Sequence, residues 1–266
     1  MWDRILFIWR TGWDLHPSLL LLIGLGCGVY IYGLRGWRPP EQPVPGNQIA
    51  LFASGMLVLV FTLQSPLHHL AEAYLFSAHM TQHLLLTMAV PPLVLLGTPE
   101  WMAKRALNSP MLARFGRTQA YPVIAFAAFH IPFMYLHFPG IYETAFGIDL
   151  VHRLTHLFLL ATGLLTWMPL LSPAPSILPR LSLPAQMLYA FVQTLPGQLV
   201  RALVTLSAEV LYTKYAFAPT LLDVNPVDDQ QLGGLIMWVV GGTFWLVVLT
   251  VLFFVWAHRE VKRPWG

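Results

Sequence analysis

Charged residues are scarce in this chain. Lys, Arg, Asp and Glu make up only 10% of its 266 residues, whereas soluble globular proteins average about 25%. A water-soluble enzyme of ordinary type is therefore excluded, because too little polar surface is available to cover a globular fold. Intrinsic disorder is excluded as well, since it requires low hydrophobicity and 56% of these residues are hydrophobic.

Cysteine pairs and nucleotide-binding motifs are also missing. The single cysteine, Cys27, excludes an intramolecular disulfide and a paired-thiol metal motif. No phosphate-binding loop or dinucleotide fingerprint occurs, and His79-Met-Thr-Gln-His83 lacks the glutamate of the zinc-protease motif. The net charge of +3, without a basic patch, argues against a nucleic-acid partner. These absences favour a membrane protein that is not an enzyme.

Long apolar runs are abundant. A membrane-spanning helix needs about 20 mostly apolar residues, and seven segments qualify. They cover approximately residues 17–34, 48–64, 79–96, 121–138, 150–171, 184–206 and 234–257. The runs are too long and too uniformly apolar for the strands of a membrane barrel. We therefore predict an all-α fold with seven transmembrane helices in a single domain, residues 1–266.

The first residues show a different pattern. Trp2, Ile5, Leu6, Trp9 and Trp13 recur at helical spacing, and the charged residues fall between them. This pattern predicts a short amphipathic helix that lies in the membrane interface in contact with the lipid bilayer.

Basic residues alternate between the two sides of the predicted bundle. They follow spans one, three, five and seven, whereas the loops after spans two and four contain none, and the loop after span six combines Lys214 with acidic residues such as Asp223. The positive-inside rule then predicts a cytoplasmic C-terminus and an external N-terminus. The residues on the predicted cytoplasmic side are Arg35, Arg38, Lys104, Arg105, Arg114, Arg117, Arg180, Arg259, Lys262 and Arg263.

Ten histidines are unusual in so apolar a chain, and nine of them fall in the predicted outer half. His79 and His83 are four residues apart, as are His152 and His156, so each pair shares a helix face. His130 lies on a third span at a similar predicted depth. Paired imidazoles on helix faces can hold a metal ion, and copper suits imidazole together with thioether. These five histidines are the predicted ligands.

Neighbouring groups admit two interpretations. Asp228 and Asp229 precede span seven, where they either cap the helix N-terminus or face the metal. Methionines such as Met237 could bind Cu(I), but most of the ten are expected to serve in packing. The histidines predicted to lie at the interface are His16, His68, His69 and His258.

Several short motifs occur together between Gln48 and Ala257. They are Ser65-Pro-Leu, Phe76-Ser-Ala-His79-Met-Thr-Gln-His83, Pro91-Pro-Leu, Leu96-Gly-Thr-Pro99, His130-Ile-Pro132, His152-Arg-Leu-Thr-His156, Leu211-Tyr212 and Asp229-Gln-Gln-Leu-Gly-Gly-Leu-Ile-Met237-Trp238. In this combination the chain resembles the CtaG family of bacterial cytochrome c oxidase assembly factors, which are seven-helix membrane proteins.

The resemblance implies a role in maturing haem–copper oxidases by delivering copper, in the bacterial plasma membrane. The implied partners are an oxidase subunit or a copper donor protein. Asp229 is implied as a ligand or as a residue that orients an imidazole, while His68, His69 and His137 do not clearly belong to the pattern. The positions that match the family are His79, His83, His130, His152, His156 and Asp229.

Three alternatives stay open. A haem-binding redox protein would use histidines of different helices as axial ligands, although two histidines four apart on one helix cannot reach opposite faces of one haem. A proton-coupled transporter would use intramembrane histidines as a relay, but the inner halves of the spans lack ionisable residues. A metal-free scaffold for an oxidase subunit would use the histidines only as hydrogen-bond partners.

Overall fold

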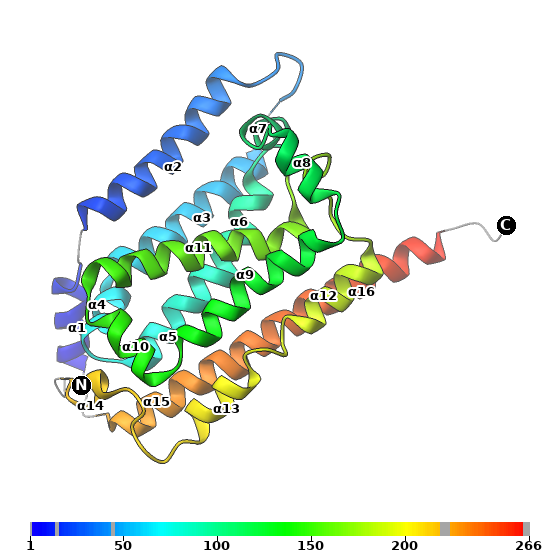
Figure 1. Ribbon diagram of the computed structural model, residues 1–266. Helices are drawn as coiled ribbons and strands as arrows, with labels where there is room; N and C mark the ends of the chain where they lie inside the picture. Colours follow the sequence, from blue (N-terminus) through cyan, green and yellow to red (C-terminus); the bar gives the residue numbers. More distant parts are fainter. Residues whose placement is uncertain (1, 14–15, 44–45, 219–223, 263–266) are drawn as a thin grey trace.

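The computed structural model describes residues 2–13, 16–43, 46–218 and 224–262 (Figure 1). Within these residues, helices are the only regular secondary structure. The predicted all-α fold is confirmed for these residues. Asp223 and Arg263, which entered the prediction of topology, lie outside them. In chain order the helices are α1 (Trp2–Thr11), α2 (Pro17–Gly36), α3 (Gly46–Gln64), α4 (Pro66–Ala73), α5 (Phe76–Leu84), η1 (Leu85–Ala89), α6 (Val90–Gly97), α7 (Glu100–Ala106), α8 (Pro110–Gly116), α9 (Ala120–Leu136), α10 (Pro139–Phe146), α11 (Asp149–Leu171), α12 (Leu183–Val192), α13 (Gln198–Leu206), α14 (Thr213–Ala216), α15 (Pro226–Leu235), η2 (Ile236–Val240) and α16 (Gly241–Val261).

Five continuous helical segments of the described chain are long and apolar enough to cross a membrane. They are Leu19–Gly36, Gly46–Gln64, Phe76–Gly97, Leu150–Leu171 and Pro226–Val261. They correspond to predicted spans one, two, three, five and seven. A multi-pass membrane protein is therefore supported.

Predicted spans four and six have a different form. α9 is 17 residues long and meets α8 at 93°, and this bent pair gives a sixth candidate span if it is counted as one. Predicted span six is divided into α12 and α13, which flank Pro196 and Gly197. Proline has no amide N–H to donate and glycine weakens a helix, so the helical ladder is interrupted there.

Span three is one continuous rod made of α5, η1 and α6. Pro91 has no N–H, so the carbonyl of Thr87, one turn earlier, has no helical donor. The indole Nε1 of Trp167 on α11 donates to that carbonyl at 2.9 Å. η1 is a π-helical turn that begins two residues after His83, and such turns are frequent at functional sites.

The bundle has two ends (Figure 1). At one end lie α1, α4, α10 and α14, together with the first turns of α5, α11 and α15; we call it the histidine end. At the other end lie α7, α8 and the last turns of α16. Between the two ends, Trp167 of α11 and Trp245 of α16 stack within an apolar cluster, their ring centroids 4.8 Å apart. The predicted helix at the N-terminus is confirmed as α1, which packs against α4.

Candidate metal centre

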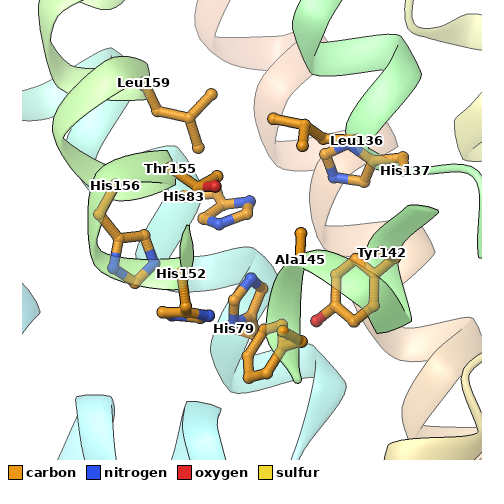
Figure 2. Close-up of a pocket in the computed structure, with 11 residues that line it drawn as sticks. His79, His83, Leu136, His137, Tyr142, Ala145, His152, Thr155, His156 and Leu159 are labelled. Carbon is orange, nitrogen blue, oxygen red and sulfur yellow. The ribbon is translucent and has the colours of Figure 1, made fainter. Parts of the chain in front are cut away.

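Five histidines of three helices line one cavity at the histidine end. His79 and His83 come from α5, His152 and His156 from α11, and His137 follows the last turn of α9. Figure 2 shows their imidazole rings gathered around the same space. The cavity measures about 20 Å³, and about 10–15 Å³ of such space holds one water molecule. It therefore has room for one water molecule or one small ion.

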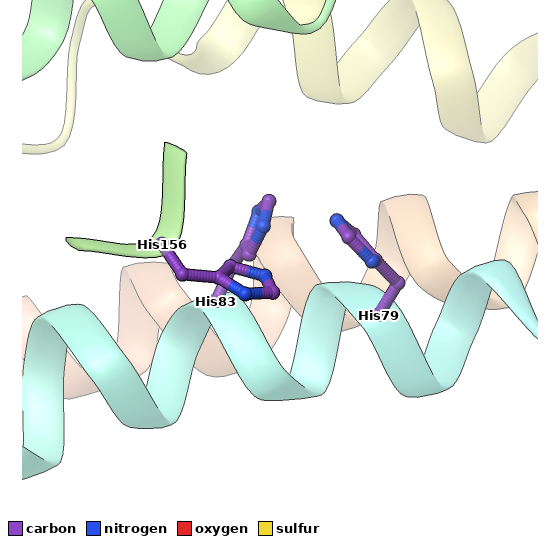
Figure 3. Close-up of side chains that lie close together, drawn as sticks. All are labelled: His79, His83 and His156. Carbon is purple, nitrogen blue, oxygen red and sulfur yellow. The ribbon is translucent and has the colours of Figure 1, made fainter. Parts of the chain in front are cut away.

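Three of these histidines lie closest together. One ring nitrogen each from His79, His83 and His156 lies within 4.8 Å of the other two. Figure 3 shows His79 and His83 one turn apart on α5, with His156 reaching toward them from α11 and lying closest to His83 in this view. The ring centroids of His79 and His83 are 4.2 Å apart, and that of His156 is 5.6 Å from His83. The spacing of four residues on each helix produces this arrangement, because it returns both side chains to one face.

Several imidazole nitrogens in the cavity lack hydrogen bonds among the described residues, although His137 Nδ1 lies 2.6 Å from the Phe133 carbonyl oxygen. His79 Nδ1, both nitrogens of His83, His156 Nε2 and His137 Nε2 are buried with no hydrogen-bond partner among the described residues. Leaving a buried polar atom unsatisfied costs about 1–3 kcal/mol. Natural proteins rarely leave such atoms unpaired without an unseen water, an ion or a functional role. The donor set therefore fits a metal ion that prefers nitrogen ligands.

Aromatic residues close the cavity toward the histidine end. Phe146 of α10 lies 4.7 Å from His79 and 4.0 Å from His152 between ring centroids. Tyr142 lines the cavity, and its hydroxyl lies 3.1 Å from that of Tyr215 on α14. Burial raises the pKa of both phenols above the ordinary value. Both stay protonated, so imidazoles are the ligands that the cavity offers.

Asp229 lies outside the cavity and holds the helix that carries two of the histidines. Its carboxylate accepts a hydrogen bond from the backbone N–H of Phe76 at 2.6 Å and further hydrogen bonds from Ser77. Leu75 at the N-cap of α5 has no side-chain acceptor of its own. Asp229 therefore caps α5 from α15 and meets the positive end of its dipole. A Cβ on Gly233 would lie 2.4 Å from the Phe76 ring, so only glycine allows this approach.

His130 also lies outside the cavity. Its Nε2 is 2.5 Å from Oε1 of Gln193, whose Nε2 donates to the Thr166 hydroxyl at 3.1 Å. Its ring packs between Phe126 and Phe129, with centroids 4.4 and 5.0 Å away. The structure thus brings together four of the six predicted ligands, which are His79, His83, His152 and His156. The other two lie outside the cavity, where His130 contacts Gln193 and Asp229 caps α5.

The sequence profile of the cytochrome c oxidase caa3 assembly factor family (Caa3_CtaG) matches residues 28–259. The chain belongs to this family. The suspected resemblance to CtaG proteins is confirmed. Curated relatives of this family member include uncharacterised proteins of Mycobacterium bovis and Mycobacterium tuberculosis, each 27% identical, and of Mycobacterium leprae, 24% identical, over 97% of this chain. The chain spans about 40% of the length of these relatives. No solved structure matches it significantly.

Two histidines of this assembly-factor family member lie closer to the centre than the sequence indicated. His137 lines the cavity, and its ring centroid is 5.9 Å from that of His83. His68 is buried, and its ring centroid is 6.1 Å from that of His156. The signal for His137 was its spacing of seven from His130. For His68 the sequence offered only proximity, because its helix is short and lies outside the predicted spans.

The methionines near the histidines pack elsewhere. Met80 and Met237 are fully buried in an apolar cluster with Phe76 and Tyr212, and Met134 packs against the same cluster. The cavity lining includes no methionine among the described residues. The packing role expected for most methionines therefore holds for these three.

Proposed function

We propose that this protein binds copper in the five-histidine cavity and delivers it to a haem–copper cytochrome c oxidase during assembly. Family membership supports the assembly role. The observation that carries the copper proposal is the set of buried ring nitrogens of His79, His83 and His156, which lie within 4.8 Å of one another and lack hydrogen bonds among the described residues. Imidazole is a good ligand for copper.

The ligands differ in role. His79, His83 and His156 bind the ion directly, and His152 and His137 are close enough to exchange with them. Asp229 is a positioning residue that fixes the start of α5, and His130 belongs to the hydrogen-bond network of Gln193. More imidazoles than one ion needs allow copper to move by replacing one ligand at a time. Such exchange suits a protein that must release its cargo, and it requires no enzymatic step.

We further propose seven crossings of the bacterial plasma membrane, with the histidine end outside and the C-terminus in the cytoplasm. α9 supplies the fourth crossing. α12 and α13 together supply the sixth, since α12 packs along α16 and α13 along α15 (Figure 1). In this orientation, copper reaches the cavity from outside. The exposed Leu6, Phe7 and Trp9 of α1 rest in the interface.

The size of the cavity favours a copper ion over a haem group as the ligand. About 20 Å³ accommodates one small ion, and a haem macrocycle does not fit beside these five imidazoles. A metal-free scaffold would gain nothing from buried imidazoles without hydrogen bonds, which destabilise a fold. The partners expected on this proposal are a copper donor protein and an oxidase subunit that accepts the ion.

Elemental analysis tests the proposal. The protein is purified in detergent with an affinity tag that contains no histidine, incubated with Cu(I), and freed of excess metal. We expect copper to remain bound to the wild type and to be lost from the His79→Ala/His83→Ala variant. His258→Ala, which removes an exposed histidine of α16, is the matched control. A folded wild type without copper would contradict the proposal and favour the scaffold.

Maturation of the oxidase in cells gives a second readout. A strain carrying His79→Ala/His83→Ala should assemble oxidase that lacks copper, and added copper should partly restore it. Normal oxidase in that strain would contradict the delivery role even if the purified protein binds copper.

A further inference from the structure

A second group of potential ligands lies beside the five-histidine cavity. One ligand atom each from His16, His68 and Glu72 lies within 4.8 Å of the other two. The Oε1 atom of Glu72 is 3.2 Å from Nε2 of His68, and the ring centroids of His16 and His68 are 5.4 Å apart. We propose that these three residues form a second metal site, which captures a divalent ion and exchanges it with the five-histidine cavity.

A hydrogen bond from the protein backbone fixes the position of His16 in this group. The backbone N–H of His16, just before α2, donates to Oε1 of Gln64 at 2.8 Å, and Gln64 is the fully buried last residue of α3. Pro66 begins α4, on which His68 and Glu72 are four residues apart and share a face. The residue before α2 and the helix α4 therefore bring three donors together from two separate segments of the chain. The bond from Gln64 fixes the backbone position from which the His16 imidazole reaches the other two donors.

Gln82 sets the tautomer of His68. Its Nε2 lies 2.8 Å from Nδ1 of His68 and 2.9 Å from the carbonyl of Thr62, so it donates to both. In this state the imidazole proton is on Nε2 and faces Glu72. When a metal takes Nε2, the proton moves to Nδ1, and Gln82 turns its carboxamide to accept it. This rotation of the carboxamide breaks the hydrogen bond to the Thr62 carbonyl. In return, it gives a donor to Gln82 Oε1, which is buried and lacks a hydrogen bond among the described residues.

The donor set selects the class of ion. Two imidazoles and one carboxylate suit divalent copper or zinc, whereas the softer Cu(I) favours ligands without carboxylate. A neighbouring cavity of about 70 Å³ is lined by His16, Glu72, His152, Arg153 and Lys214, with Phe146. The two cations repel a divalent ion. The affinity of the second site is therefore limited, as a transfer site requires.

Glu72 joins the second site to the first. Its Oε1 lies 3.5 Å from Nε2 of His152, and His152 lines both cavities. An ion can pass by ligand exchange: bonds to His68 and Glu72 break as bonds to His152 and His156 form. The oxidation state of the ion does not change, and no proton carrier beyond the imidazoles is needed.

This inference deepens the proposed function: the second site stands on its own three residues, whereas the exchange with the five-histidine cavity and the choice of copper rest on that function. The test uses the full chain in detergent, purified with a tag free of histidine, and Cu(II) as the probe. Bound copper is counted by elemental analysis, and its ligands are followed by electron paramagnetic resonance. The second-site variant is His16→Ala/Glu72→Gln, the first-site variant is His79→Ala/His83→Ala, and His69→Ala is the matched control on α4. A melting curve of each variant establishes that it is folded.

We expect the wild type and His69→Ala to bind about two ions and each double variant about one, with the spectrum of a mixed nitrogen and oxygen site remaining in the first-site variant. One ion in the wild type that only the first-site variant loses would overturn this inference and leave the proposed function standing. One ion that only the second-site variant loses would overturn the exchange and leave the second site itself standing, and the Cu(I) experiment above then decides the proposed function. Two ions in the second-site variant would also overturn the inference.

Discussion

His130 and His83 are both buried inside the bundle, but His130 has a hydrogen bond at one ring nitrogen, whereas His83 has none among the described residues. His130 bonds to Gln193 through Nε2, and Gln193 bonds onward to Thr166. In the cavity, His83 has no hydrogen bond at either nitrogen among the described residues. The first arrangement stabilises a fold, since each buried polar group that is paired avoids a desolvation cost. The second forgoes stability and keeps lone pairs available, which is what a binding site requires.

The largest expected effect is the difference in copper affinity between a His83 variant and a His130 variant. His83→Ala should lower copper affinity by more than about 100-fold, beyond the 10–100-fold typical of residues behind the ligands, and should leave the free energy of unfolding almost unchanged. His130→Ala should leave copper binding intact. It should lower the free energy of unfolding by about 1–3 kcal/mol, because Gln193 loses its partner. Copper titration and denaturant unfolding of both variants measure these effects. Loss of copper from folded His130→Ala would make His130 a ligand and remove the distinction.

A smaller effect is expected at Asp229, which touches α5 but not the cavity. Asp229→Asn removes the charge at the α5 N-terminus and should lower the free energy of unfolding by about 0.5–2 kcal/mol. Copper affinity should fall by about 10-fold through the displaced start of α5, while the amount bound at saturating copper stays the same. Titration with copper and thermal unfolding measure the two quantities.

The neighbour Asp228 supplies the control for that experiment. It is exposed on the same turn of α15, so Asp228→Asn should change neither quantity. If Asp229→Asn abolished copper binding at saturation while α5 stayed folded, Asp229 would be a direct ligand and not a positioning residue.

Much of the fold and the centre of the site follow from local patterns. Apolar length alone predicts the continuous spans, and the spacing of His79 with His83 and of His152 with His156 predicts which side chains share a face. Both signals need only the geometry of one helix.

The rest depends on how helices pack. The cap that Asp229 places on α5 joins residues more than 150 positions apart, and the sequence suggested instead a cap on its own helix. His68 lies on a short helix whose direction is set by Pro66 and by contacts with α5. The interruption between α12 and α13 follows from Pro196 and Gly197, but in membranes a proline often stays inside a helix, so the pair alone does not predict it.

The smallest effect should come from Met237, the methionine that the sequence suggested as a possible Cu(I) ligand. Met237 is buried with Phe76 and Met80, and the cavity lining has no methionine among the described residues. Met237→Leu keeps the volume and removes the sulfur, so copper affinity should not change. The free energy of unfolding should change by less than about 1.5 kcal/mol, as for other substitutions that conserve volume. A clear loss of Cu(I) affinity with Cu(II) affinity unchanged would show that the thioether reaches the ion. The cavity would then be a mixed imidazole and thioether site, and the contrast with His130 would no longer rest on imidazoles alone.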